Sequence, residues 1–164
     1  MLHYFIGRQA IYDHNLNVIG YELLYRSHNA AFNDGIDDED YATSLVLLNS
    51  FMEAGLEELV GPHKAFINLT RKFILNGDLI PPAKHQLVLE ILEDIEVDGE
   101  LIQAVKTLKT KGYTIALDDF IYHDTIQPLV ELADIIKIDL RALDEATLRD
   151  YVQRLKPYPL KLLA

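Results

Sequence analysis

The chain has 164 residues, of which 49% are hydrophobic and 25% charged, a composition typical of a globular domain. Its net charge of -11 argues against a polymeric nucleic acid or an anionic membrane surface as a partner. The sequence has no cysteine, which excludes disulfides and thiolate chemistry, and no long apolar stretch that would span a membrane. We therefore expect a cytoplasmic protein.

The N-terminal third predicts a β-hairpin followed by a helix. Two apolar, β-prone runs, Tyr4–Tyr12 and Val18–Tyr25, flank the turn residues 13–17. A polar, acidic stretch, Ser27–Asp40, comes next, and helical spacing of apolar residues then runs over Tyr41–Ala54. An antiparallel hairpin at this place departs from a purely parallel barrel.

From residue 60 onward, short apolar runs alternate with helical patterns, as in an α/β protein with parallel strands. Asp98 and Asp144 are the expected caps of two helices, and Gly112 is the expected end of the first. Shorter helices are predicted over Thr70–Asn76 and Thr125–Leu132. A last apolar run, 160–164, is predicted to be a further strand.

Polar residues stand at the ends of the apolar runs. In a barrel of parallel strands these ends open onto one face, so the side chains meet at a single mouth. Hard oxygen ligands beside one cation suit Mg²⁺ or Mn²⁺ and an anionic substrate. A complete eight-stranded barrel typically needs about 250 residues, so we predict an incomplete (β/α) TIM-type barrel with an antiparallel N-terminal strand. The residues at the run ends are Glu22, Asn68, Glu90, Asp118, Asp119 and Lys137.

The ordered motifs resemble the EAL domain, a bacterial family that hydrolyses cyclic di-GMP to the linear dinucleotide pGpG on a modified α/β barrel. The resemblance covers nearly the whole chain and is closest to the subgroup in which an EAL-like domain precedes an HDOD domain. It implies that residues 1–164 are a partial EAL-like domain, without the last barrel strands and the C-terminal signalling domain. The motifs are Gly20–Arg26, Asn68, Glu90–Asp94, Asp118–Tyr122 and Lys137-Ile138-Asp139.

The resemblance also implies a role for each matching residue. The ligands of a first metal would be Glu22, Asn68, Glu90 and Asp118, with Asp119 between two metals or holding the second. Lys137 would hold the attacking water or neutralise charge on the phosphate, so that Glu22, Asp119 and Lys137 are the expected catalytic residues. Gln9 would contact a guanine of the ligand, and Arg26 would clamp a phosphate.

Three departures from the family pattern bear on catalysis. The segment Ile121–Thr125 replaces a Gly-Thr-Gly-type loop, and Leu92 stands where the family has threonine. The glutamate of the seventh strand would fall just after Ala164. We therefore expect the chain to bind cyclic di-GMP, with hydrolysis belonging to the complete protein.

Other interpretations start from the same residues. A non-catalytic module could regulate an attached domain without binding the nucleotide, and an unrelated barrel enzyme could use the metal on another phosphorylated substrate. Taken singly, the strand-end residues are also common as turn residues or helix caps. An unclosed barrel leaves a sheet edge to cover, so a homodimer or edge-paired oligomer is expected.

Overall fold

The computed structural model describes residues 4–13, 15–27, 43, 46–47 and 55–163. Its strands form one mixed sheet in the order of the sequence, from β1 to β7. β1 runs antiparallel to β2, and every later neighbour pair is parallel. The strands are β1 (Tyr4–Tyr12), β2 (Val18–Ser27), β3 (Lys64–Leu69), β4 (Leu87–Ile91), β5 (Thr114–Leu117), β6 (Ile135–Lys137) and β7 (Lys161–Leu163).

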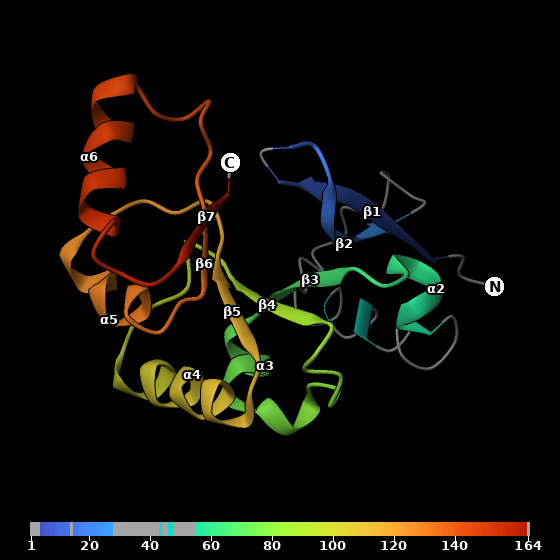
Figure 1. Ribbon diagram of the computed structural model, residues 1–164. Coiled ribbons are helices and arrows are strands. Elements are labelled where there is room, and N and C mark those ends of the chain that lie inside the picture. Colours follow the sequence, from blue (N-terminus) through green and yellow to red (C-terminus); the bar gives the residue numbers. More distant parts are fainter. Residues whose placement is uncertain (1–3, 14, 28–42, 44–45, 48–54, 164) are drawn as a thin grey trace.

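The sheet curls into part of a barrel, with helices α3, α4 and α5 lying along one side of it (Figure 1). This arrangement confirms the predicted incomplete TIM-type barrel with an antiparallel first strand. Among the described residues, no helix has the length and apolar character needed to cross a membrane. The helices are α2 (Leu56–Val60), α3 (Arg71–Leu75), α4 (Gly99–Lys111), α5 (Gln127–Val130) and α6 (Glu145–Leu155), with 3₁₀ turns η2 (Gly77–Leu79) and η3 (Asp124–Ile126).

The helix ends follow the sequence signals closely. The carboxylates of Asp98 and Asp144 accept hydrogen bonds from the backbone N–H groups of Leu101 (2.8 Å) and Thr147 (2.7 Å), so both are N-caps as predicted. Gly112 ends α4 in the left-handed conformation, with a φ of 93°.

One predicted helix is shorter than expected, and another lies mostly outside the residues that the structure describes. The helix expected over Thr125–Leu132 is shorter, because η3 occupies its first residues and α5 begins only at Gln127. The helix expected over Tyr41–Ala54 lies mostly outside the described residues. Thr43, Val46 and Leu47 belong to it, are helical and are buried.

Alternation along the strands separates two apolar layers. On the outer face, Ile67, Leu89 and Ile115 are buried in the main core with α4 residues such as Leu101 and Val105. On the inner face a smaller cluster is formed by Phe66, Val88, Ala116 and Leu163. Because side chains two residues apart point to the same face, the next inner positions along β3, β4 and β5 are Asn68, Glu90 and Asp118.

Gly20 makes room for this inner layer. A Cβ atom at this position would lie 2.6 Å from Phe66 Cε2 and 2.9 Å from the carbonyl oxygen of Lys64. The aromatic ring of Phe66 is 1% exposed, so it has little space into which to retreat. A side chain on Gly20 would therefore overpack the layer directly below the polar strand ends.

We predict that Gly20→Ala destabilises the protein by about 1–3 kcal/mol, the usual cost of overpacking a core. Gly99→Ala is the matched control, because a Cβ at the start of α4 would meet nothing within 4 Å. This control is expected to be neutral or to gain about 0.4–1 kcal/mol. Chemical denaturation of both variants measures the difference. Equal stabilities would contradict the close packing of Phe66 against β2.

Candidate metal centre

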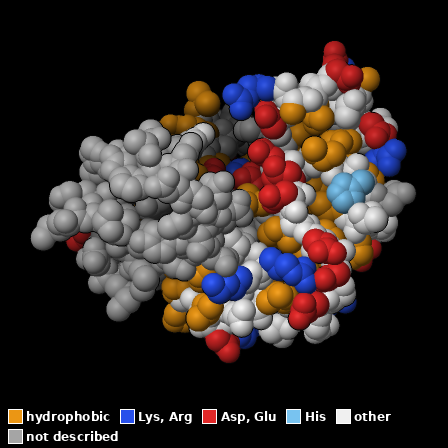
Figure 2. All heavy atoms as spheres, turned by 180° about the vertical axis from the view of Figure 1, so that it is seen from behind, with side chains coloured by type: hydrophobic (Ala, Val, Ile, Leu, Met, Phe, Trp, Pro, Cys, Tyr) orange, Lys and Arg blue, Asp and Glu red, His pale blue; other side chains and the backbone are white. Residues whose placement is uncertain are grey.

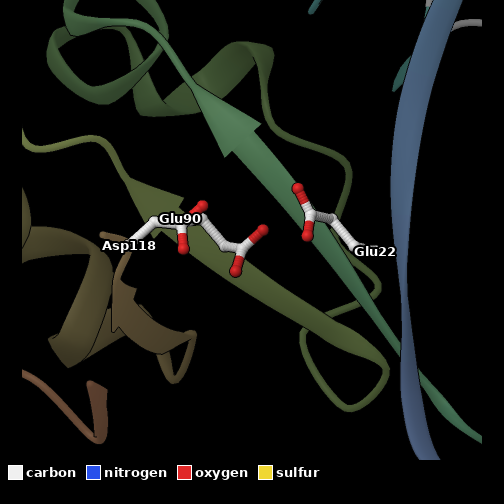
Figure 3. Close-up of side chains that lie close together, drawn as sticks. All are labelled: Glu22, Glu90 and Asp118. Carbon is white, nitrogen blue, oxygen red and sulfur yellow. The ribbon is translucent and has the colours of Figure 1, made fainter. Parts of the chain in front are cut away.

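Strand register brings together polar side chains that lie on, or directly after, five neighbouring strands, β2 to β6. Asn68 on β3 pairs with Glu90 on β4, and Glu90 pairs with Ala116, two residues before Asp118. Leu117 pairs with Ile136, so that Lys137 ends β6 beside Asp118. Figure 3 shows the carboxylates of Glu22, Glu90 and Asp118 pointing toward one another. Figure 2 shows acidic side chains gathered beside a hollow on one face of the molecule.

The ammonium group of Lys137 lies among these three carboxylates. Its Nζ atom is 2.7 Å from Asp118 Oδ1, 2.9 Å from Glu90 Oε1 and 3.2 Å from Glu22 Oε2. The lysine side chain is 19% exposed and Glu90 is fully buried. Three acids thus share one basic partner in a site that is largely shielded from water.

Several oxygens of the cluster accept no hydrogen bond within the described part of the chain: Asn68 Oδ1 and both carboxylate oxygens of Glu90. Glu90 Oε1 has only its charge contact with Lys137. The amide nitrogen of Asn68 donates to Glu22 Oε1 at 3.3 Å. Buried oxygens without donors are costly unless a cation or water satisfies them.

The donor set fits a hard divalent cation. Glu22, Glu90 and Asp118 each offer an oxygen, and these atoms lie within 4.8 Å of one another. Carboxylate and amide oxygens are the ligands that Mg²⁺, Mn²⁺ and Ca²⁺ prefer. The four ligands expected for a first metal, Glu22, Asn68, Glu90 and Asp118, are therefore brought to one place by the fold.

Burial and crowding of like charges alter the acidity of the cluster. Burial raises the pKa of Glu90 from its usual value of 4.5 to about 8, with Asp118 and Glu22 adding to the rise and Lys137 opposing it. For Lys137, burial disfavours the charged form, but attraction to Glu90 and Asp118 outweighs it and raises its pKa. The lysine therefore stays cationic at neutral pH.

Asp119 lies at the edge of this cluster, and its side chain is exposed. Its φ of 42° turns the chain sharply after β5, and its backbone N–H donates to Asp118 Oδ1 at 3.0 Å. Burial, and then the neighbouring Asp118 charge, raise its pKa. It lies outside the group of three carboxylates that could share one metal.

The two expected ligand-contacting residues lie on the hairpin. Gln9 on β1 is directly opposite Glu22 on β2, and its side chain is exposed. Opposite residues of an antiparallel pair share a face, so Gln9 lies beside the cluster. The backbone of Arg26 is in β2, opposite Phe5, and its side chain lies outside the described residues.

Sequence reasoning missed one residue that helps to position the site. Thr43 is buried, with 7% of its surface exposed, and its hydroxyl donates to the backbone carbonyl of Asn68 at 3.2 Å. It thereby ties Thr43, a helical residue ahead of α2, to the end of β3. A threonine among the inward-facing positions of a predicted helix was the available signal.

The pKa of Glu90 predicts a pH-dependent stability in metal-free buffer. A carboxyl group whose pKa is raised on folding stabilises the protein fully below pH 4.5, and this contribution is lost as pH rises toward 8. Each unit of pKa difference corresponds to about 1.4 kcal/mol. The glutamine of Glu90→Gln cannot ionise. As pH rises from 4.5 toward 8, the unfolding free energy of this variant is therefore expected to fall less than that of the wild type. Parallel pH profiles for the wild type and this variant would contradict the prediction.

Two curated proteins are similar to the chain in sequence, whereas no family model matches it. The chain is 37% identical to YuxH of Bacillus subtilis over 140 residues, which are 82% of this chain and 34% of YuxH. It is 30% identical to the cyclic di-GMP phosphodiesterase CdgJ of Vibrio cholerae, over 85% of this chain and 32% of that protein. The chain thus spans about a third of the length of these relatives.

Solved structures of EAL-domain proteins have the same fold. The YkuI protein of Bacillus subtilis, solved with cyclic di-GMP and calcium, matches with a TM-score of 0.73 and 22% identity, over 97% of this chain and 47% of that one. An EAL domain protein of Listeria monocytogenes matches with a TM-score of 0.73 and 20% identity, over 97% of this chain and 76% of that one. The resemblance of the sequence motifs to the EAL domain is thus confirmed, and the chain has the fold of an EAL domain.

Proposed function

We propose that this chain is a cyclic di-GMP signalling domain that binds the dinucleotide with the help of divalent metal, and that the complete protein hydrolyses it to linear pGpG. The observation that carries the proposal is the convergence of Glu22, Glu90, Asp118 and Lys137 in one cluster of contacts. Similarity to a cyclic di-GMP phosphodiesterase and to an EAL protein solved with this nucleotide supports the choice of ligand.

The residues of the cluster have distinct parts in the proposed chemistry. Glu22, Asn68, Glu90 and Asp118 would hold a first metal, which we propose to be Mg²⁺ or Mn²⁺. Metal bound there would polarise the phosphodiester and lower the pKa of a nearby water. The cationic Lys137 would face the negative charge that develops on the phosphate.

Three further residues would complete the interactions. Asp119, exposed beside Asp118, is proposed to face a second metal. Gln9 is proposed to contact a guanine of the ligand, because it is exposed on the strand directly opposite Glu22. Arg26, farther along the same strand β2, is proposed to bind a phosphate with its planar guanidinium.

A non-catalytic regulatory role is the second candidate, and the segment after Asp119 favours it. There the ring of Tyr122 packs edge-on against Phe120, with centroids 6.0 Å apart, and lies 6.3 Å from the ring of Tyr151. Arg154 stacks over the same ring at 5.0 Å. Residues Tyr151 and Arg154 of α6 thus hold the segment Ile121–Thr125, which replaces the family's glycine-rich loop. A segment fixed in this way suits a surface that binds another protein.

We further propose self-association, a C-terminal signalling domain in the parent protein and a cytoplasmic location. Self-association across an exposed sheet edge would pair backbone groups that the sheet itself leaves open. A C-terminal HDOD signalling domain in the parent protein is compatible with relatives about three times as long as the matched region. A cytoplasmic location suits a second messenger made and consumed inside bacteria.

Calorimetric titration of cyclic di-GMP into the chain tests the binding proposal. With Mg²⁺ or Mn²⁺ present, saturable binding to one site is expected, and chelation of the metal should weaken it strongly. Asp118→Ala removes a metal ligand and should reduce metal-dependent affinity about 10–100-fold. Asp78→Ala is the control, since Asp78 is fully exposed and pairs with Lys111 at the end of α4, with no contact to the cluster.

Chromatography of the nucleotide after incubation separates the two candidate functions. Conversion to pGpG by the parent protein, abolished by Asp118→Ala, would establish the phosphodiesterase. Binding without linear product would identify a sensor. Equal affinity of the wild type and Asp118→Ala, with or without metal, would refute the metal-dependent site.

A further inference from the structure

We propose that Lys137 is a built-in competitor of the metal: its ammonium occupies the centre of the carboxylate cluster in the metal-free protein and must leave before a divalent cation enters. This inference rests on the metal-binding part of the proposed function and adds a way to control it. It assigns Lys137 a role before metal binds, separate from any contact with substrate.

The first argument is that the ammonium and a metal would occupy the same space. Lys137 Nζ contacts one oxygen each of Glu22, Glu90 and Asp118 at 2.7–3.2 Å. These are the three side chains whose oxygens lie close enough together to share one ion. A metal bound by them at about 2.0–2.6 Å would stand where the ammonium now is. The two cations therefore exclude each other.

The second argument is that the metal-free cluster needs a cation. Glu90 is fully buried, and Asp118 and Glu22 have 12% and 15% of their side chains exposed. Among the described residues, Lys137 is the one basic side chain paired with any of the three. Without it, the negative charge of this shielded cluster would be uncompensated, which is strongly destabilising. Lys137 would thus hold the carboxylates together whenever no metal is bound.

The third argument is that the lysine has a route out. Lys137 is the last residue of β6, and 19% of its side chain already reaches solvent. A lysine stem is flexible, so its ammonium can swing toward the rim while the backbone stays in the sheet. At the rim the displaced cation would meet an incoming anion. A phosphate ligand would then favour the metal-bound arrangement, so metal and ligand would bind cooperatively.

The test is calorimetric titration of Mg²⁺ and Mn²⁺ into the chain without nucleotide. Lys137→Met keeps much of the stem and removes the charge. If the lysine occupies the site most of the time, its loss should raise metal affinity about tenfold or more. Lys109→Met makes the same charge change at a pair with Asp134, which precedes β6 at the opposite end of that strand. Its affinity should remain that of the wild type.

A second measurement uses the wild type, so it tests the inference even if Lys137→Met folds poorly without metal. In the wild type labelled with ¹⁵N, the paired ammonium of Lys137 should give a protected NMR signal that is lost on adding Mg²⁺. The Lys109 signal should persist. A Lys137 signal that survives saturation with Mg²⁺ would overturn the inference.

The outcomes also separate this inference from the proposal beneath it. Equal or weaker metal binding by Lys137→Met, with normal binding by the wild type, would overturn the competition and leave the metal centre standing. Absence of binding by the wild type and by Lys137→Met would overturn both. Binding by Lys137→Met alone would support the competition in its strongest form.

Discussion

The structure depends on one electrostatic constraint: three acidic side chains, one buried and two half-buried, converge from different strands and require a cation. Lys137 satisfies it in the metal-free protein, through contacts with Glu22, Glu90 and Asp118. Such a cluster is costly to build and is retained where function needs it. The cost of burying charge is clearest at Glu90, because burial raises the pKa of its carboxyl group to about 8. The proposed metal chemistry and the proposed competition both follow from this arrangement.

The rest of the fold serves to hold these side chains in register. Parallel pairing from β2 to β7 brings successive strand ends to one edge, and alternation sets the site on the apolar layer of Phe66, Val88 and Ala116. Helices lie along the outside of the sheet (Figure 1). The main core is formed by buried side chains of the strands and of these helices. Rigid elements on both sides limit the motion available to the acids. Lys137, at a strand end with a flexible stem, retains the most freedom.

Much of this could be predicted from the sequence, because strand ends and helix caps leave local signals. The hairpin, the α/β alternation, the caps Asp98 and Asp144, and the gathering of Asn68 and Glu90 at one face are all confirmed. These features follow from periodicity and from the geometry of parallel strands, which make few other arrangements possible.

What could not be predicted depends on contacts between distant segments. Lys137 and Glu22 are 115 residues apart, and their contact arises only once the sheet curls. The sequence indicated a lysine near phosphate, whereas its position among the acids required side-chain geometry. The outward position of Asp119 depends on its φ of 42°, and the buried hydroxyl of Thr43 on the approach of a helix to β3. Residue types alone specify neither.

The most direct measurement is anomalous diffraction from crystals of the chain soaked in Mn²⁺. The account predicts a manganese peak within bonding distance of Glu22, Asn68, Glu90 and Asp118, with Lys137 turned away from that position. A fully soaked crystal with no peak there, or with Lys137 still seated among the three carboxylates beside a peak elsewhere, would contradict it.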